Sequence, residues 1–269
     1  MHANNPVRRP PIAVVGVSAL FPGSLGAAPF WRNIFDGADL ITDVPESHWR
    51  IDDYYDPDPS APDKTYAKRG GFLPPVPFDP LAFGIPPATL SATDTAQLLA
   101  LIVAKQVLED ASRGQFRDVD RRRISVILGV ASATELVVEL GSRIQRPVWT
   151  NAMRAAGLSE TQIRDVCDRI ANHYVPWQEA SFPGLLGNVV AGRIANRLDL
   201  GGTNVVTDAA CASSFAALEM GLNELYLGQS DLVISGGVDA INDIFMYMCF
   251  SKTPALSQSA IKRLSVRSV

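Results

Sequence analysis

The stretch from Thr203 to Val238 constrains the fold of this chain more than any other part of it. Asn204 to Thr207 is a short β-branched run, typical of a buried strand, and Asp231 to Ser235 is a second apolar strand. Between them a helix is expected from Ser213 to Leu227, because apolar residues recur on one face of it: Phe215, Leu218, Leu222 and Leu225. A strand, a crossover helix and another strand of this length form a right-handed parallel unit, which predicts an α/β fold.

Cys211 lies where the first of these strands turns into the helix, among the small residues Ala209, Ala210, Ala212 and Ser213. The free amides at a helix start, together with the positive end of the helix dipole, stabilise a thiolate and an oxyanion formed beside it. The pattern therefore suits an acyl-accepting nucleophile whose own backbone amide is a candidate oxyanion donor. A bare cysteine in such a turn is more often a small buried residue that fills space.

The wider pattern carries a resemblance to a known family. VTDAACASS, followed by a helix and then DLVISGGV, resembles the nucleophile segment of the β-ketoacyl synthases, condensing enzymes of the thiolase superfamily. GNVVAGRIANRLDLGGTNVVTDAACASS extends the similarity upstream and FSKTPALS extends it downstream, while IAVVGVSALFPGS and FWRNIFDGADLITDVPESHW resemble the family's amino-terminal segment. DKTYAKRGGFLPPVPFDPLAFGIPP is most similar to ketosynthases of polyunsaturated fatty acid synthases and iterative type I polyketide synthases. The resemblance covers about Pro11 to Ser257.

The resemblance implies a fold and a domain plan. The expected fold is the amino-terminal half of a thiolase-like α/β fold, a parallel-rich mixed sheet with flanking and central helices, truncated before the carboxy-terminal half. Residues 1–10 are expected to be a disordered tail, and residues 11–257 the synthase domain. Within that domain, residues 45–87 form an excursion with ten of the nineteen prolines. Residues 258–269, with the sequence QSAIKRLSVRSV, depart from the family pattern and are expected to form a divergent tail.

The resemblance also implies a reaction. Cys211 accepts an acyl group from a phosphopantetheine thioester, and a malonyl thioester then loses carbon dioxide and condenses with it to a β-ketoacyl product. In the family, two histidines and a lysine of the carboxy-terminal half stabilise the enolate. None of the three histidines of this chain, His2, His48 and His173, lies in a matching motif. The chain is therefore expected to be an amino-terminal fragment, a frameshifted copy or one piece of a split protein, and condensation is not expected from it alone.

Other residues are assigned by position in the family. Phe250 matches a position that faces the acyl chain, and Ser132 matches one near the acyl tunnel and the dimer interface. The large apolar residues from Phe245 to Phe250 are equally typical of core packing. The expected partners are an acyl carrier protein, a second copy paired through the strand near 203–207, and a complementary carboxy-terminal half. No bound cofactor and no metal are expected.

Composition agrees with this interpretation. The chain has 269 residues, of which 47% are hydrophobic and 19% are charged, typical of a globular protein with one large domain or two small ones. A net charge of −4 gives no indication of nucleic-acid binding, and three scattered cysteines indicate neither a disulfide framework nor a metal cluster. The sequence shows no signal peptide and no apolar run of the ~20 residues that span a bilayer, so a cytoplasmic protein is expected.

Local patterns predict further elements. Ile12 to Val17 is expected to be the first strand, Asp94 to Ala111 a helix, and Ile124 to Leu128 another strand. Ser159 and Gln162 form a capping box that opens a helix with Cys167 on its buried face, while His173 is expected at the surface. A further helix is predicted over residues 188–198. The basic run of residues 121–123 suits a solvated turn or a contact with an acidic carrier protein.

Two classes of function remain open. The first is a condensing-enzyme domain that carries the acyl-Cys nucleophile and needs a complementary half for turnover. The second is a non-catalytic remnant or interaction module that dimerises or docks on a synthase, with an inert Cys211. Either way, the helix over 213–227 is expected to expose apolar surface. An α/β cysteine hydrolase would need a His–Cys pair, and no motif supports one.

Overall fold

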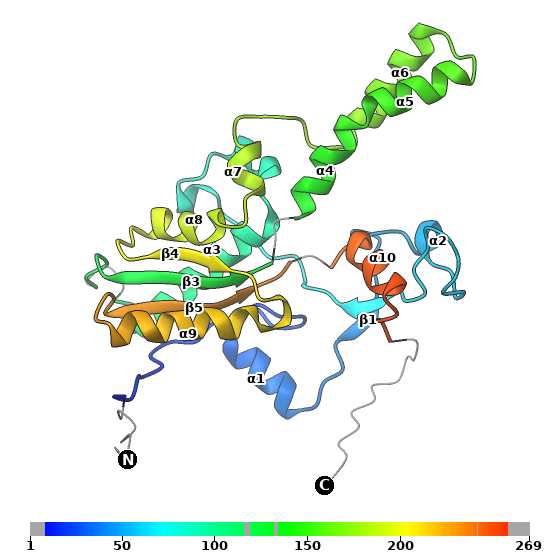
Figure 1. The fold of residues 1–269 in the computed structure, drawn as a ribbon. Helices are drawn as coiled ribbons and strands as arrows, with labels where there is room; N and C mark the ends of the chain where they lie inside the picture. The colour runs from blue at the N-terminus through cyan, green and yellow to red at the C-terminus, as the bar shows by residue number, and fades with distance from the viewer. Residues whose placement is uncertain (1–8, 116–118, 132–133, 241, 258–269) are drawn as a thin grey trace, which may run out of the picture. The chain divides into compact units, whose positions relative to one another are not determined.

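A computed structural model describes residues 9–115, 119–131, 134–240 and 242–257 of the chain, and Figure 1 shows its fold. Contacts between residues divide the chain into two compact units. The first unit comprises the described residues within 1–19 and 77–240, and the second those within 20–76 and 241–269. The predicted domain boundaries at residues 10 and 257 stay predictions.

A three-stranded parallel sheet forms the centre of the first unit. Its order is β4 (Asn204–Thr207), β3 (Ile124–Val130) and β5 (Leu232–Val238). The register places Val126 opposite Asn204 on one side and Ile124 opposite Leu232 on the other. All seven residues of β3 are buried, as expected for the middle strand of a sheet covered on both faces. The predicted α/β class and the predicted parallel pairing are confirmed.

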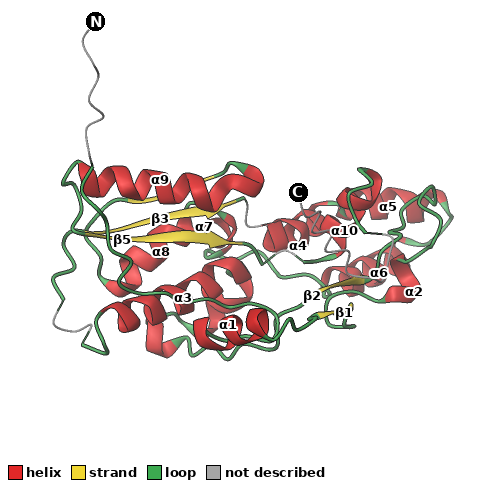
Figure 2. Cartoon of the chain, turned by 90° about the horizontal axis from the view of Figure 1, so that it is seen from below, coloured by secondary structure: helices red, strands yellow, loops and turns green. Residues whose placement is uncertain are grey.

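Helices cover both faces of this sheet. Figure 2 shows it between α9 (Ser213–Tyr226) on one side and α8 (Val189–Leu198) and α3 (Thr95–Ala111) on the other. The core between α3, α8 and the strands consists of aliphatic side chains, among them Leu101, Val126, Val190, Ile194 and Ile234. Two 3-10 turns, η1 (Leu81–Phe83) and η2 (Pro87–Ala92), precede α3. The predicted helices over 94–111 and 188–198 are thereby confirmed.

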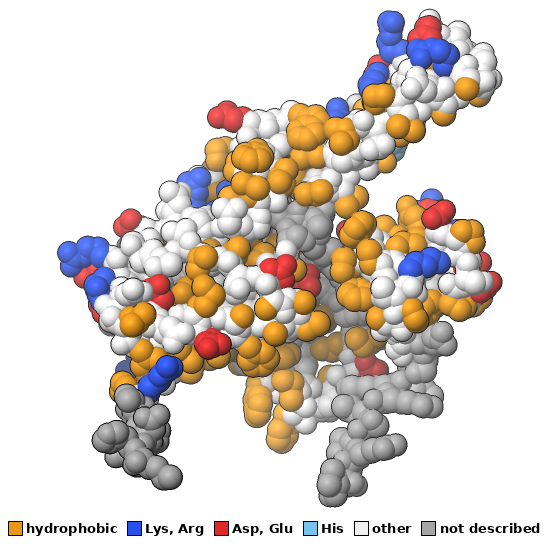
Figure 3. All heavy atoms as spheres, in the orientation of Figure 1, with side chains coloured by type: hydrophobic (Ala, Val, Ile, Leu, Met, Phe, Trp, Pro, Cys, Tyr) orange, Lys and Arg blue, Asp and Glu red, His pale blue; other side chains and the backbone are white. Residues whose placement is uncertain are grey.

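The helix α9 rests on the sheet through small residues. Its buried positions are Ser213, Ala217 and Gly221, and a Cβ atom added at Gly221 would lie 2.9 Å from Cγ1 of Val233. The large apolar side chains point away from the sheet, so that Phe215 is 73% exposed and Leu218 is 48% exposed. The apolar surface expected on this helix is therefore present, as the orange side chains over α9 in Figure 3 show.

The predicted first strand over residues 12–17 is wrong. These residues form no strand in the structure, and Val14 is 83% exposed. The segment lies along α3 instead: the backbone N–H of Val17 donates to Asp110, 2.9 Å away, and the Ser18 hydroxyl donates to Gln106. A β-branched run becomes a strand only where a neighbouring strand pairs with its backbone groups, and here α3 takes that place.

Four further helices lie between β3 and α8. They are α4 (Thr134–Ile144), α5 (Arg146–Ala155), α6 (Glu160–Ala171) and α7 (Ser181–Leu185), and Figure 1 shows α4 to α6 extending away from the sheet. The predicted capping box is present, since Ser159 accepts from the N–H of Gln162 and the Gln162 side chain accepts from the N–H of Ser159. Cys167 is buried and His173 is exposed, as predicted.

The second unit is built on a small antiparallel sheet. Its elements are α1 (Ala27–Phe35), β1 (Ile41–Asp43), α2 (Ile51–Tyr54), β2 (Arg69–Gly71) and α10 (Ile244–Lys252), with β1 and β2 paired. Val44, Trp49 and Tyr247 form its core, and the Tyr247 hydroxyl donates to the carbonyl of Arg69 at 3.1 Å. This unit therefore joins residues 45–76 of the proline-rich segment to the end of the described chain. Within the part of the chain described, no helix is long and apolar enough to cross a membrane.

Candidate active site

Cys211 is exposed in a single 3-10 turn, η4 (Ala210–Ala212), between the carboxyl end of β4 and the start of α9. The predicted strand, turn and helix around this residue are thereby confirmed. Since α9 has fourteen residues and begins two positions after Cys211, the thiol lies close to the positive end of a full helix dipole.

Two side chains hold the turn in place. The backbone N–H of Ala210 donates to Oδ1 of Asp208 at 2.9 Å. The hydroxyl of Ser213 accepts from the N–H of Ala209 at 2.9 Å and donates to the carbonyl of Ala210 at 2.7 Å. Ala210 has a φ of 49°, which lies in the left-handed region that residues with a Cβ atom rarely adopt. The chain therefore reverses sharply just before the cysteine, and side-chain hydrogen bonds support the reversal.

Glycines at the ends of two strands let the helix start approach the sheet. A Cβ atom added at Gly129, near the end of β3, would lie 2.5 Å from the backbone carbon of Ser213. One added at Gly237, in β5, would lie 3.1 Å from Cβ of Ser214. The first turn of α9 thus sits directly on two strand ends, and the position of Cys211 depends on the absence of side chains there.

This arrangement suits a nucleophile that works at a helix start. The residue before α9 is Ala212, whose side chain cannot accept a hydrogen bond from the first-turn amides. Those amides and the helix dipole favour negative charge on an oxygen bound beside the sulfur. Within the described part of the first unit no hydrogen bond joins Cys211 to His173, and among all described residues no group of three His, Cys, Asp or Glu side chains is placed to hold a metal ion.

The other predicted residues have different outcomes. Phe250 lies in α10 of the second unit and is 44% exposed, and its contact with an acyl chain stays a prediction. Ser132 lies outside the described residues.

In the basic run of residues 121–123, Arg122 pairs with Asp120 at 2.7 Å and Arg123 pairs with Asp231 at 2.9 Å. These intramolecular pairs favour the solvated turn over the contact with a carrier protein.

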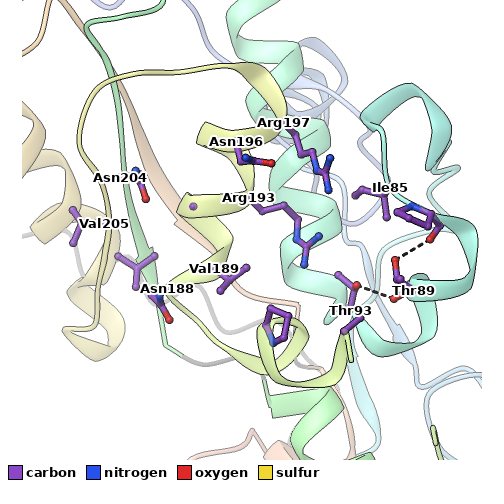
Figure 4. A pocket seen from close by; sticks show the side chains of 15 residues that line it. Ile85, Thr89, Thr93, Asn188, Val189, Arg193, Asn196, Arg197, Asn204 and Val205 are labelled. Carbon is purple, nitrogen blue, oxygen red and sulfur yellow. Dashed lines mark hydrogen bonds between the residues drawn. The ribbon is translucent and has the colours of Figure 1, made fainter. Parts of the chain in front are cut away.

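A cavity of about 520 Å³ lies elsewhere in the first unit, and Cys211 is not among its lining residues. Figure 4 shows that its walls come from α8, from β4 and from the segment between Ile85 and Thr93. Neither this cavity nor the supporting roles of Asp208, Ser213 and Gly129 were predicted from the sequence. For Gly129, the signal was a glycine directly after an apolar strand pattern, since glycine in or beside a strand often marks the close approach of another segment.

Known proteins resemble this chain over nearly its whole length. The family described as Beta-ketoacyl synthase, N-terminal domain, matches residues 9–267. A polyunsaturated fatty acid synthase polypeptide of Thraustochytrium sp. is 36% identical, over 91% of this chain and 9% of that protein. A phenolphthiocerol/phthiocerol polyketide synthase polypeptide of Mycobacterium tuberculosis is 32% identical, over 92% of this chain and 12% of that protein. The chain thus spans a small part of each of these relatives.

Solved structures give a consistent result. The oxazolomycin ketosynthase domain of Streptomyces albus has a TM-score of 0.69 and 27% identity, covering 91% of this chain and 37% of that one. A ketosynthase from module 6 of the bacillaene synthase of Bacillus subtilis has a TM-score of 0.66, covering 91% and 35%. At 24% identity, this second likeness concerns the fold alone.

Proposed function

Since this chain belongs to the β-ketoacyl synthase family through its amino-terminal domain, we propose that Cys211 accepts the acyl group that the synthase extends. The donor is a thioester on the phosphopantetheine arm of an acyl carrier protein, in a fatty acid or polyketide pathway of the cytoplasm. The observation that carries the proposal is the placement of an exposed Cys211 in a tightly supported turn at the start of α9.

The transfer itself needs few groups. The thiolate of Cys211 adds to the thioester carbonyl to form a new C–S bond, and the tetrahedral intermediate then collapses with cleavage of the bond to the phosphopantetheine sulfur. The pantetheine thiolate leaves and takes up the proton that Cys211 released. The backbone N–H of Cys211 is the proposed donor to the oxyanion of the tetrahedral intermediate, because amides at a helix start carry partial positive charge. Ala212 and Ser213 leave the space beside the sulfur open.

The second step is condensation. The malonyl thioester loses carbon dioxide, and its carbanion attacks the acyl-Cys carbonyl, which releases the Cys211 thiolate and forms the β-ketoacyl product. We assign the donors that stabilise the enolate to a complementary carboxy-terminal half, because neither His48 nor His173 lies in a motif that matches the family's histidines. Condensation by this chain alone is therefore expected to be slow or absent. Phe250 and Ser132 are proposed to line the acyl pocket.

A homodimer is part of the proposal. In the sheet order β4-β3-β5, the strand β4 is an edge strand with β3 on one side. Pairing of the segment 203–207 with its copy in a second chain would extend this sheet, since edge strands offer unpaired backbone groups. Sedimentation velocity at increasing protein concentration checks this, and a chain that stays monomeric throughout would contradict it.

The second candidate is a non-catalytic module that dimerises or docks on a synthase. The apolar face of α9, with Phe215 73% exposed, is the observation that favours it. In that case Cys211 has no role, and its thiol reacts no faster than any other exposed thiol. The reactivity of Cys211 therefore separates the two candidates.

The test uses intact-protein mass spectrometry after exposure to an acyl thioester and, separately, to iodoacetamide. The chain contains its own control, because Cys211 and Cys249 are both exposed whereas Cys167 is buried. We expect a single adduct near neutral pH, absent from Cys211→Ala and retained in Cys249→Ala, formed about tenfold faster than any at Cys249. Equal rates of adduct formation at Cys211 and Cys249 in a folded sample would contradict the acyl-transfer proposal and favour the non-catalytic module.

A further inference from the structure

Helix α9 begins just after Cys211 and has a carboxylate in its last turn. Its sheet-facing stripe consists of Ser213, Ala217 and Gly221, and Glu224 continues this stripe at the spacing of one helix face. Figure 2 shows α9 lying along the sheet. Ser213 and Glu224 are about 16 Å apart along the axis of a regular helix. Because the helix moves as one rod, a shift at Glu224 also moves the amides beside Cys211.

The carboxylate of Glu224 accepts hydrogen bonds at the start of each strand of the parallel sheet. Thr203, directly before β4, donates its hydroxyl to Oε1 at 3.1 Å, and Ser230, two residues before β5, donates to Oε2 at 2.9 Å. The hydroxyl of Ser125, in the first turn of β3, lies 3.4 Å from Oε2. One side chain therefore connects the last turn of α9 to the amino-terminal ends of β4, β3 and β5.

The hydroxyl groups around the carboxylate form an ordered chain of donors. Oγ of Ser125 accepts from the N–H of Thr203 at 2.9 Å and lies 2.6 Å from Oγ of Ser230. Because an ionised carboxylate only accepts, the hydrogen of Ser230 points to Glu224, and Ser125 then donates to Ser230. Both serines are buried. Removal of the carboxylate would leave a buried hydroxyl without its acceptor, which is unfavourable for the whole chain of hydrogen bonds.

Glu224 lies where the helix itself disfavours a negative charge. The carboxyl end of a helix is the negative end of its dipole, and the last turn of α9 contains no basic residue. The hydroxyl donors offset this unfavourable term. The rest of the stripe fixes the helix only weakly along its axis, because Ser213, Ala217 and Gly221 have no large side chains that interlock with the sheet. A position that breaks a local preference in this way often serves the function of the site.

We propose that Glu224 is a positioning residue for acyl transfer: its hydrogen bonds to the strand starts set the axial position of α9, and with it the position of the amides beside Cys211. This inference rests on the proposed function of Cys211. An oxyanion needs its donors at a fixed distance, and a misplacement of about 1 Å lowers a rate by up to about a hundredfold.

Two reactions of Cys211 distinguish positioning from folding. Acylation by the hexanoyl thioester of N-acetylcysteamine passes through an oxyanion, whereas alkylation by iodoacetamide displaces iodide without forming one. We expect Glu224→Ala to slow acylation of Cys211 about tenfold and to change its alkylation by less than about twofold. Intact-protein mass spectrometry of the full chain measures both rates. Equal slowing of the two reactions, or no slowing of either, would overturn the proposal.

Two further variants serve as controls. Glu224→Gln keeps one acceptor and gains a donor for the second hydroxyl, so its acylation should stay within about threefold of wild type. Ile163→Val tests for a general effect of lost stability, because Ile163 is buried in α6, which Figure 1 shows well away from α9. Its smaller side chain should lower the urea midpoint and leave both rates unchanged. If Glu224→Gln were as slow as Glu224→Ala, or if Ile163→Val slowed acylation, positioning by these hydrogen bonds would be wrong.

The wild-type chain separates the failure of this inference from the failure of the proposed function. If wild-type Cys211 takes no acyl group from the thioester, the proposed function fails and the inference fails with it. If wild-type Cys211 is acylated, and Glu224→Ala is acylated at the same rate, only the role of Glu224 is wrong.

Discussion

At the scale of single residues, Ala210 shows how much the nucleophile turn depends on backbone geometry. Its φ of 49° is disfavoured for any residue with a Cβ atom, and much more so for a β-branched one. We expect Ala210→Val to lower the free energy of unfolding by about 1–2 kcal/mol. The same change should slow the alkylation of Cys211, because the turn can relax only by moving the cysteine.

Urea denaturation and the rate of iodoacetamide labelling measure both effects. Ala210→Gly is the control, because glycine adopts this φ without strain, and its stability should stay within about 1 kcal/mol of wild type. If Val and Gly at this position behaved alike, the strained turn would not be what positions Cys211.

Asp94 gives the fold a pH dependence. It is 2% exposed and caps α3 by accepting from the N–H of Ala96. Burial raises the pKa of Asp94 above its ordinary 3.8, and the charge of Glu135 adds to the rise. The folded chain then holds the proton more tightly than the unfolded chain. The contribution of Asp94 to stability is therefore full below pH 3.8 and is lost as the pH rises through the raised pKa.

Asp94→Asn keeps the cap but cannot ionise. The urea midpoint of this variant should therefore increase relative to that of wild type as the pH rises above 3.8. Asp120→Asn should show the opposite trend, since hydrogen bonds from Arg122 lower the pKa of Asp120 to about 2. The contribution of Asp120 to stability is lost as the pH falls from 3.8 toward 2. A difference between wild type and Asp94→Asn that is constant with pH would contradict the buried-carboxyl interpretation.

At the scale of elements, the contact between β3 and α9 sets the position of the nucleophile. A methyl group at Gly129 would meet the backbone of Ser213, which can give way only if the helix start moves. Gly129→Ala is expected to cost about 1–3 kcal/mol of stability and to reduce the labelling of Cys211. Gly236 in β5 is a matched control, because a Cβ atom there meets no atom within 4 Å.

Gly236→Ala should therefore be neutral or stabilising by about 0.5 kcal/mol. Chemical denaturation of the two variants in parallel measures the difference. If Gly236→Ala lost as much stability as Gly129→Ala, any side chain at these strand ends would be destabilising, whether or not it approaches α9.

The same elements show what the sequence could and could not predict. The helix that follows Asp94 and the strand that begins at Ile124 were predictable, because caps and apolar runs are local signals. The family resemblance is confirmed by the match over residues 9–267, and the role of Cys211 stays a prediction. The expected strand over 12–17 failed because its backbone lies along α3, and pairing partners are not a local property. The cavity beside α8 was missed for the same reason: its walls are far apart in sequence.

At the scale of the whole molecule, the exposed face of α9 governs association. Helix α9 packs on the sheet through its small residues, so Phe215 and Leu218 contribute little to the stability of this chain. Exposed apolar surface instead favours contacts between molecules, by about 25 cal/mol for each Å² removed from water. Phe215→Ser should therefore leave the free energy of unfolding within about 0.5 kcal/mol of wild type and reduce the species larger than a dimer.

Sedimentation velocity over a range of concentrations measures this association, with urea denaturation as the check on folding. Phe182→Ser is the matched control, because Phe182 is 70% exposed, close to the 73% of Phe215, but lies on α7. If surface apolarity in general drives association, the two substitutions should act equally. If the face of α9 drives it, Phe215→Ser alone should lower the large species, and Leu218→Ser should add to its effect because both residues belong to one exposed face.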